Sequence, residues 1–187
     1  MNKRPDITDM TRTQLVEAFC HFYKEMPIDK ITVKQIAERA GYNRITFYRY
    51  FKDVYDILDY IEDDFIAYAF KRITLAIQNG IKHEEFIDTF IHLITEKKGY
   101  VEVLMTGKNV NHTLDRIKRT MVPAVMKNFG LAEDDLNSKY IFEFYVSGVL
   151  SVCSCWLQNG YDLTEDKIVA IIENFLKGGV IPQIKSL

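Results

Sequence analysis

The sequence predicts an all-α protein in two parts, a short N-terminal unit over residues 1–53 and a longer helical bundle over residues 54–187. Three observations lead to this expectation. Only 4 prolines and 9 glycines interrupt the 187 residues. Apolar side chains recur at the spacing of amphipathic helices, and strand-like alternation is scarce. Near residues 52–56 the chain changes from basic with short helices to acidic with long ones.

The first predicted helix covers residues 11–26, and its apolar residues lie three or four positions apart, as one buried helix face requires. These residues are Leu15, Phe19, Phe22 and Met26. Thr8 or Thr11 is expected to cap the start, because a threonine side chain accepts a hydrogen bond from an exposed backbone N–H there. Pro27 is expected to end the helix, because the residue before a proline avoids helical geometry.

The next two predicted helices are short and joined by a tight turn. Thr32 is a good N-cap, and Gln35, three residues later, can complete a capping box. Gly41 stands where this second helix must stop, at a position suited to the left-handed conformation. A third helix is then expected over residues 43–51. Two helices joined by a turn that contains a glycine form a helix-turn-helix.

Six further helices complete the predicted fold. They cover residues 54–79, 83–96, 99–106, 110–128, 135–159 and 164–177, with Gly80, Gly160 and Gly178 as stops, Thr164 as a cap and Pro123 as a kink. The longest uncharged stretch, residues 144–157, is shorter than the ~20 residues that span a bilayer. We therefore expect a buried helix inside a protein and no membrane segment. The polar N-terminus lacks the apolar stretch of a signal peptide.

The net charge of −2 combines two segments of opposite sign. Residues 1–52 carry 10 Lys/Arg against 6 Asp/Glu, a net of +4, whereas residues 53–187 carry 14 against 20, a net of −6. Such an asymmetry favours a polyanionic partner for the basic segment.

The third predicted helix carries the chemistry that this partner requires. Residues 43–52 contain two arginines, a lysine, an asparagine, a threonine and two tyrosines. If Phe47 and Phe51 point inward, the polar side chains lie on the outer faces. Arginine can bind guanine through two hydrogen bonds and asparagine can bind adenine, while tyrosine and lysine can hold phosphates.

At these residues the sequence resembles the TetR family of bacterial transcriptional regulators. The matching pattern is Thr32-Val33-x-x-Ile36-Ala37-x-x-Ala40-Gly41-Tyr42-Asn43-Arg44-x-Thr46-Phe47-Tyr48-x-Tyr50-Phe51-Lys52-Asp53-x-Tyr55-Asp56-Ile57-Leu58. The resemblance implies an N-terminal DNA-binding domain followed by a variable helical domain that dimerises and often binds a small effector.

The resemblance also implies a role for individual residues. DNA contacts are expected from Thr32, Lys34, Asn43, Arg44, Thr46, Tyr48, Arg49, Tyr50 and Lys52. Packing positions are expected at Ile36, Ala37, Ala40, Phe47, Phe51 and Leu58. The sequence departs from the pattern at two positions. Ile45 replaces a residue that is small in many members, which argues against close backbone approach there, and Val54 replaces a frequent basic residue, which removes one phosphate contact.

Small residues inside the uncharged helix suggest where two chains meet. Ser147, Gly148, Ser151 and Ser154 recur at spacings of three and four, which lets another helix approach closely. We expect the last two helices of two chains to form a four-helix dimer interface. The alternative is that this stripe packs within one chain.

The effector pocket is expected among large adaptable or aromatic side chains of the second part. The candidates are Met105, Met121, Met126, Phe142, Tyr145 and Trp156, and the same residues are equally suited to an ordinary helical core.

No metal, cofactor or catalytic site is expected. The 3 cysteines are too few for a disulfide framework, which favours a reducing compartment, the cytoplasm. Cys153 and Cys155 on one helix point about 200° apart, so they cannot chelate one ion, and buried thiols are expected. The sequence has no nucleophile elbow, phosphate loop or dinucleotide fingerprint.

The sequence therefore predicts a cytoplasmic homodimeric repressor that binds a palindromic double-stranded DNA operator and is released by a small effector. One alternative is a helical ligand-binding or hydrolytic domain that merely retains a helix-turn-helix. Another is a co-regulator of the same fold whose C-terminal domain binds a protein partner instead of a metabolite.

Overall fold

The computed structural model describes residues 5–81, 83–105, 110–128, 130 and 135–179, which form α-helices and one 3₁₀ turn with no strand among them. The all-α prediction is confirmed. The chain divides into two compact units, Met1–Phe65 and Ile66–Leu187. The boundary between these units falls inside one long helix, whereas the boundary proposed from the sequence is at the start of that helix.

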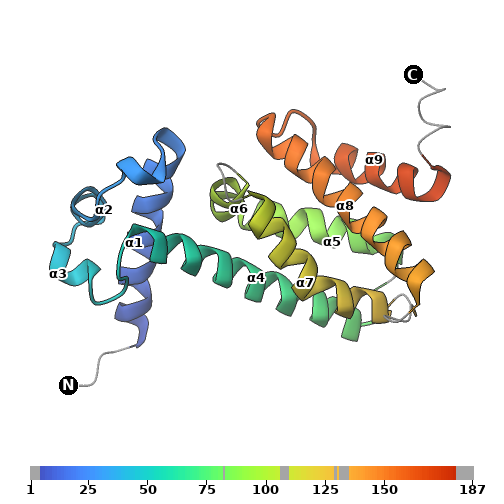
Figure 1. Ribbon diagram of the computed structural model, residues 1–187, viewed down its shortest axis with the longest axis horizontal. Coiled ribbons are helices and arrows are strands. Elements are labelled where there is room, and N and C mark those ends of the chain that lie inside the picture. Colours follow the sequence, from blue (N-terminus) through green and yellow to red (C-terminus); the bar gives the residue numbers. More distant parts are fainter. Residues whose placement is uncertain (1–4, 82, 106–109, 129, 131–134, 180–187) are drawn as a thin grey trace. The chain divides into compact units, whose positions relative to one another are not determined.

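The first unit contains α1 (Pro5–Glu25), η1 (Ile28–Lys30), α2 (Val33–Arg39), α3 (Arg44–Phe47) and the beginning of α4 (Val54–Gln78) (Figure 1). Helix α1 packs on α2, and α2 packs on α3. The core of this unit consists of side chains with no exposed surface, and these are Leu15, Val16, Phe19, Ile36, Phe47, Ile57 and Ile61. Each α-helix of the unit contributes to it, so burial of these residues holds the short helices α2 and α3 in place.

Helix α1 begins earlier than expected. It starts at Pro5, so Thr8 and Thr11 lie inside the helix, and Thr11 is buried. The predicted threonine cap is therefore wrong. A proline is well suited to the first turn of a helix, because its missing N–H has no intrahelical partner to lose there. The end of the helix at Glu25, shortly before Pro27, is as predicted.

Helix α2 is bounded by the two local signals that the sequence contains. The Thr32 hydroxyl accepts a hydrogen bond from the Gln35 backbone N–H at 3.3 Å, and the Gln35 side-chain oxygen accepts one from the Thr32 N–H at 2.9 Å. The predicted capping box is confirmed. At the other end Gly41 has φ +76°, and the Tyr42 N–H donates to the Ala37 carbonyl at 2.8 Å. This closure ends the helix after only two turns.

Helix α3 is shorter than the predicted range 43–51. Its regular α-helical residues are Arg44–Phe47, after which the Tyr50 N–H donates to the Phe47 carbonyl at 2.9 Å. That bond closes over three residues, which tightens the backbone as at many helix ends. The turn still places the Phe51 ring in the core, where it is 3% exposed.

Helix α4 begins with a reciprocal cap. The Asp53 carboxylate accepts a hydrogen bond from the Asp56 N–H at 2.9 Å, and the Asp56 carboxylate accepts one from the Lys52 N–H at 2.7 Å. The first bond satisfies an N–H group that a helix start leaves without a partner, and the second ties the preceding Lys52 to the first turn. The helix then continues to Gln78, as the sequence predicts.

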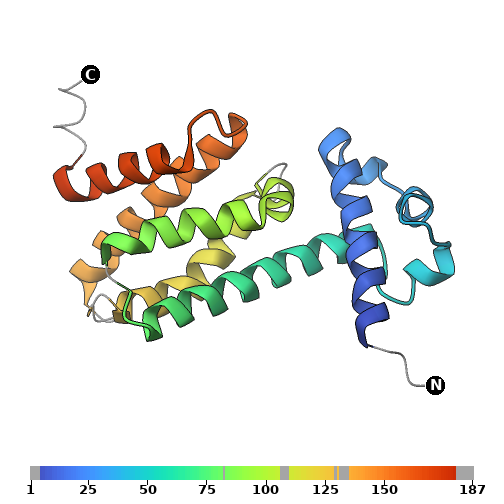
Figure 2. The same ribbon diagram turned by 180° about the vertical axis from the view of Figure 1, so that it is seen from behind.

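The second unit contains α5 (His83–Glu96), α6 (Lys98–Leu104), α7 (Val110–Asn128), α8 (Leu136–Gln158) and α9 (Glu165–Gly178). Helix α5 lies beside α9, and α8 packs against both α7 and α9 (Figure 2). The predicted ranges agree with these bounds to within a few residues, and residue 106 lies outside the described residues. Thr164 occupies the N-cap of α9, although its side chain forms no capping hydrogen bond.

Helix α8 is buried on one face only, so the buried helix expected from its uncharged stretch, residues 144–157, is only partly buried. Val149, Cys153 and Trp156 are buried, whereas Tyr140 is 72% and Phe144 77% exposed. By length and composition α8 is the one helix within the described ranges that is apolar enough to cross a membrane, and 28% of its most apolar window is buried. The neighbouring helices of this unit cover one side of α8 and leave an apolar side uncovered.

Replacement of Gly41 by alanine tests the turn between α2 and α3. No atom lies within 4 Å of the position a Cβ would occupy, so the left-handed backbone alone opposes the substitution. We expect Gly41→Ala to lower the free energy of unfolding by about 1 kcal/mol, measured by urea denaturation. Gly99→Ala, inside α6 and equally unobstructed, is the matched control and should raise it by up to about 1 kcal/mol. Equal effects at both positions would contradict the assigned role of the turn.

Candidate nucleic-acid interface and ligand cavity

The start of α3 is fixed by the side chain of Asn43. Its Oδ1 accepts hydrogen bonds from the Thr46 backbone N–H at 2.9 Å and from the Thr46 hydroxyl at 3.2 Å. The side-chain NH₂ group of Asn43 has no partner among the described residues, and the residue is exposed. Asn43 therefore caps the helix with one end of its amide and presents two hydrogen-bond donors with the other.

Two phenylalanines determine which way α3 faces. Phe47 is 0% exposed, and its ring centroid lies 5.9 Å from that of Phe51. Phe51 in turn packs against the ring of Tyr60 on α4, at 5.6 Å. With this side buried, Arg44 and Arg49 are exposed on the opposite side.

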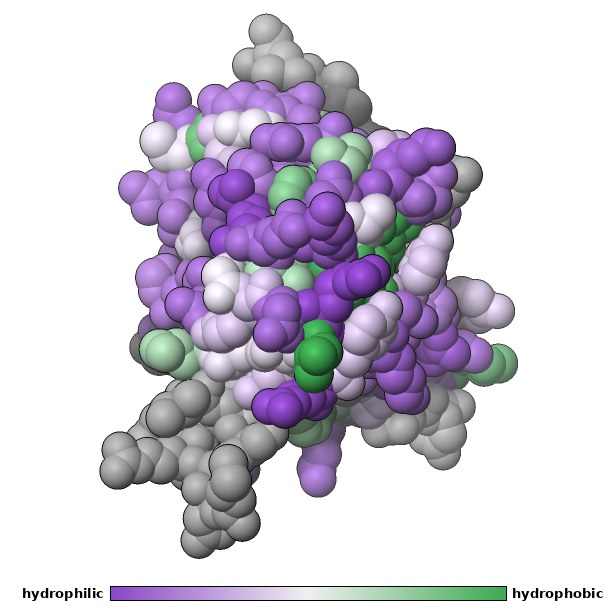
Figure 3. Space-filling view, turned by 90° about the vertical axis from the view of Figure 1, so that its left-hand side faces the viewer, coloured by the Kyte–Doolittle hydropathy of each residue, from purple (hydrophilic) through white to green (hydrophobic). Residues whose placement is uncertain are grey.

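The exposed cations near α3 are available to an external anion. Arg44, Arg49 and Lys52 form no ion pair with any residue that the structure describes. Lys34 on α2 lies 3.8 Å from Glu38, an exposed pair one helical turn apart that contributes little energy and can open readily. The surface that bears α2 and α3 is mostly hydrophilic, with isolated hydrophobic residues (Figure 3).

The residues expected to contact DNA lie together on α2, on α3 and in the turns beside them. Thr32, Lys34, Asn43, Arg44, Tyr48, Arg49 and Lys52 are exposed, and Thr46 and Tyr50 are half-buried. Tyr50 lies beneath the guanidinium of Arg12, whose Cζ is 5.8 Å from the ring centroid. Thr32 and Asn43 have capping roles in addition to any contact with DNA. The assignment of individual contacts stays a prediction.

One exposed residue on α3 was not among the expected contacts. Ile45 is 69% exposed, next to Arg44 and on the same short helix. In the sequence it stood out only as a departure from a small residue. A bulky apolar side chain with this much exposure is itself a signal, because an apolar side chain can read a thymine methyl group in the major groove.

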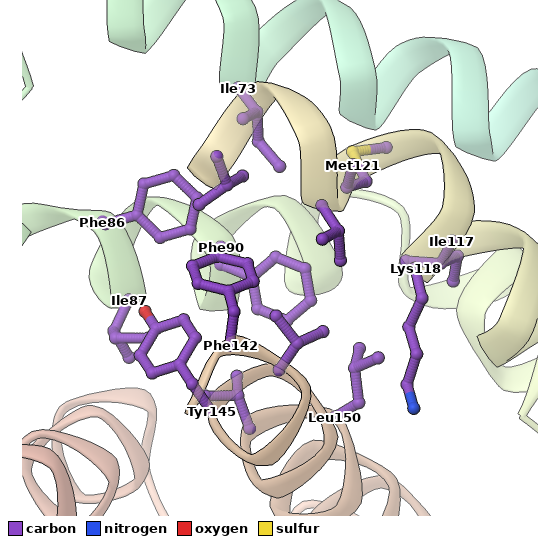
Figure 4. A pocket seen from close by; sticks show the side chains of 14 residues that line it. Ile73, Phe86, Ile87, Phe90, Ile117, Lys118, Met121, Phe142, Tyr145 and Leu150 are labelled. Atoms are coloured by element: carbon purple, nitrogen blue, oxygen red, sulfur yellow. The ribbon is translucent and has the colours of Figure 1, made fainter. Parts of the chain in front are cut away.

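The second unit contains an apolar cavity of about 50 Å³ between α4, α5, α7 and α8 (Figure 4). Its walls are hydrophobic side chains together with the Tyr145 ring and the alkyl stem of Lys118. The described residues that line it are Ile73, Phe86, Ile87, Phe90, Ile117, Lys118, Met121, Val122, Val125, Phe142, Tyr145, Val146, Val149 and Leu150. Burial raises the pKa of Tyr145 to about 12, so its hydroxyl stays protonated at neutral pH.

The structure brings three of the six expected pocket residues to this cavity. Met121, Phe142 and Tyr145 line it, and the Phe142 and Tyr145 rings lie 5.4 Å apart. Met105, Met126 and Trp156 are buried outside its lining. Phe86 and Phe90 of α5 also line the cavity but were not predicted, because their spacing is the same as that of ordinary core residues.

A polar cluster lies beside the cavity. The Lys118 ammonium donates hydrogen bonds to the Glu143 carboxylate at 2.6 Å and to the Ser147 hydroxyl at 2.7 Å. The Ser147 hydroxyl also donates to Glu143 at 2.9 Å. The hydrogen bonds from Lys118 and Ser147 hold the pKa of Glu143 below its usual value.

The two cysteines of α8 differ in environment. Cys153 is buried, and burial raises the pKa of its thiol to about 12, whereas Cys155 is exposed. The expectation that both thiols are buried is therefore wrong for Cys155, because a separation of about 200° leaves only one of them on the buried face. Within the described residues no group of three or more His, Cys, Asp or Glu side chains could hold a metal ion.

A helix-turn-helix with exposed cations, amides and hydroxyls defines a DNA-binding class of protein, and comparison with known families identifies which one. A family model described as "Bacterial regulatory proteins, tetR family" matches residues 21–61, and one described as "Transcriptional regulator C-terminal region" matches residues 82–178. The chain belongs to the TetR family of transcriptional regulators, and its helix-turn-helix domain binds DNA. No curated protein matches the sequence.

Solved structures share the fold at low sequence identity. The fatty acid degradation regulator FadR from Bacillus halodurans is 14% identical, with a TM-score of 0.73 over 96% of this chain and 98% of that chain. A tetR-family transcriptional regulator from Streptomyces coelicolor is 16% identical, with a TM-score of 0.58 over 88% and 80%. A Clostridium perfringens protein provisionally named a fatty acid metabolism regulator is 18% identical, with a TM-score of 0.60 over 89% and 98%.

Two substitutions of Asn43 separate its capping role from a role in DNA binding. Asn43→Ser keeps an oxygen that can cap α3 but removes the amide donors. We therefore expect its free energy of unfolding to stay within about 0.5 kcal/mol of that of the native chain, and its preference for one DNA sequence over others to weaken. Asn43→Ala removes both, and we expect a further loss of about 1 kcal/mol in stability. Thermal unfolding and DNA titration are measured on the same samples. If Asn43→Ser discriminates sequences as well as the native chain does, Asn43 acts only as a cap.

Proposed function

We propose that this chain is a cytoplasmic repressor that binds a palindromic operator as a homodimer and leaves it when a small effector binds. The observation that carries the proposal is the set of exposed cations around α3, which have no ion-pair partner among the described residues. Regulators of this family are generally not enzymes, and we propose no catalytic activity for this chain.

The charge distribution favours DNA binding by the first unit. A net of +4 over residues 1–52 attracts phosphates, whereas a net of −6 over residues 53–187 repels them. Each phosphate that is neutralised releases counterions, so the affinity should fall steeply with salt.

We assign base contacts to the residues that project from α3 and phosphate contacts to those beside it. Arg44 and the free amide of Asn43 suit guanine and adenine, and Ile45 suits a thymine methyl group. Lys34, Tyr50 and Lys52 are assigned to phosphates, which position the protein without reading sequence. Thr32, Thr46, Tyr48 and Arg49 complete the proposed interface.

We propose that a second copy of the chain covers the exposed face of α8. Tyr140, Ile141 and Phe144 are 72%, 65% and 77% exposed, and Phe144 lies four residues after Tyr140 and three after Ile141, so the three side chains share one side of the helix. The same face continues through the small residue Gly148, which permits close approach of a partner helix. A contiguous apolar surface of this kind is rare on a monomer, and identical copies related by a two-fold axis bury it in both chains.

We propose that the apolar portion of an effector enters the cavity and acts on α4. The cavity of about 50 Å³ has room for no more than a few water molecules, so a larger molecule must separate the helices that line it. Ile73 of α4 lines the cavity, and the same helix begins with Val54, Ile57 and Leu58 buried in the first unit. An effector that favours the separated arrangement therefore shifts the population away from the DNA-binding one.

We infer that the effector contains an aliphatic chain. The lining of the cavity is hydrophobic, and Met121 is an unbranched side chain that can adjust to a flexible chain. Two proteins of the same fold are named as regulators of fatty acid metabolism. Both observations favour a molecule with an acyl-like portion over a planar or highly polar one.

The proposed roles of Arg44 and Lys52 are distinguished by binding to duplexes of different sequence. The native chain is first used to select its preferred palindrome from a pool of random duplexes. Arg44→Ala should then reduce the difference in binding free energy between this palindrome and its single-base variants by ~1–3 kcal/mol. Lys52→Ala should weaken binding to all duplexes evenly and reduce the salt dependence. Lys71→Ala, an exposed cation of the second unit, is the control and should change neither. If the Arg44 and Lys52 variants behave alike, the assignment of base and phosphate contacts is incorrect.

The proposed dimer is tested by placing a charge on the exposed face of α8. Phe144→Asp should weaken dimerisation by about 2 kcal/mol or more, roughly 30-fold, because a desolvated carboxylate would oppose association. Phe70→Asp, on α4 and 40% exposed, is the matched control and should leave the dimer intact. Sedimentation velocity over a concentration series measures both. A native chain that sediments as a monomer would contradict the proposal, and a different protein would then be the expected partner of the exposed face of α8.

A further inference from the structure

A polar groove adjoins the apolar cavity in the second unit. The groove runs between α7 and α8 with a volume of about 510 Å³, and its lining includes Asn111, Ser151, Ser154 and Gln158. Lys118 and Leu150 line both spaces. A molecule that crosses this boundary would meet an apolar environment at one end and hydrogen-bonding groups at the other.

Lys118 is amphipathic in the way that this boundary requires. Its alkyl stem lies along the wall of the cavity, and its ammonium points away from the aromatic rings (Figure 4). The side chain is only 24% exposed, so its charge is partly removed from water. Among the described residues that line either space, Lys118 is the one cation.

An incoming anion could replace one of the present hydrogen-bond partners of the Lys118 ammonium. Two of its three N–H groups are directed to Glu143 and Ser147, and the third has no acceptor within the described residues. The Glu143 side chain is 59% exposed, so it can return to water at small cost when another anion takes its place. The other charged residue that lines the groove, Asp115, is held by Arg119 at 2.6 Å and does not compete for Lys118.

We propose that Lys118 binds the carboxylate of an amphipathic effector whose aliphatic chain occupies the cavity. This inference rests on the proposed effector-binding function and adds the charge of the head group and the residue that binds it. The ligand carboxylate takes the free N–H of Lys118 and displaces Glu143, and the Ser147 hydroxyl donates to the ligand instead. Glu143 thus acts as the internal competitor that sets the affinity.

The proposal predicts a preference for an anion over a neutral molecule of equal chain length. The probes are octanoate and octan-1-ol, titrated calorimetrically into the full-length chain. We expect octanoate to bind about tenfold more tightly or better, because a hydrogen bond to a charged partner is worth more than one to a neutral partner. Lys118→Met should abolish this preference while octan-1-ol binding is retained, which also shows that the cavity remains folded.

Two further variants make the test specific. Glu143→Gln removes the competing carboxylate and should strengthen octanoate binding several-fold without affecting octan-1-ol. Lys177→Met removes a lysine that pairs with Glu173 at 3.0 Å outside the cavity and groove, and it should change neither affinity.

The outcomes separate this inference from the proposed function. If both probes bind the native chain with equal affinity, the aliphatic effector site stands and the role of Lys118 is overturned. If neither probe binds, the aliphatic effector site and the role of Lys118 are both overturned. If Lys118→Met keeps the preference for octanoate, another group binds the carboxylate and the inference fails.

Discussion

The burial of Phe47 is the interaction on which the DNA-binding surface depends. Helix α3 has only four regular residues, far fewer than an isolated helix needs, so its own hydrogen bonds cannot hold it. Phe47 has no exposed surface and contacts Phe51, while Asn43 caps the first turn. These contacts fix both ends of α3 and its orientation. They leave Arg44, Ile45, Tyr48 and Arg49 exposed. Burial of one side of α3 therefore determines which side chains are available to DNA on the other side.

In the second unit the same division of faces serves two purposes. The buried side of α8 provides Phe142, Val149 and Leu150 to the cavity, and the exposed side presents Tyr140 and Phe144 to the proposed second copy. One helix thus joins the cavity to the proposed dimer face, and α4 continues from the cavity into the core of the first unit. A ligand that separates the lining helices would act on both at once, which is the physical basis proposed here for release from the operator.

Features that depend on a few neighbouring residues could be predicted from the sequence. The Thr32–Gln35 capping box and the left-handed Gly41 are of this kind, as are most helix ranges. The start of α1 could not be predicted, because Pro5, Thr8 and Thr11 are each suited to the start of a helix. The cavity lining depends on which helices pack together, so Phe86 and Phe90 could not be distinguished from core residues. The uncovered face of α8 could not be predicted either, because apolar composition alone does not show which side of a helix its neighbours cover.

The central claim is that the surface around α3 reads a palindromic DNA sequence. Its most direct test is the affinity of the native chain for the selected palindrome and for a shuffled duplex of the same composition, measured by fluorescence anisotropy at several salt concentrations. We predict binding that is tighter for the palindrome by about 10³-fold or more, with two chains per site and a linear fall of log affinity with log salt. Equal affinity for both duplexes at every salt concentration would contradict the account.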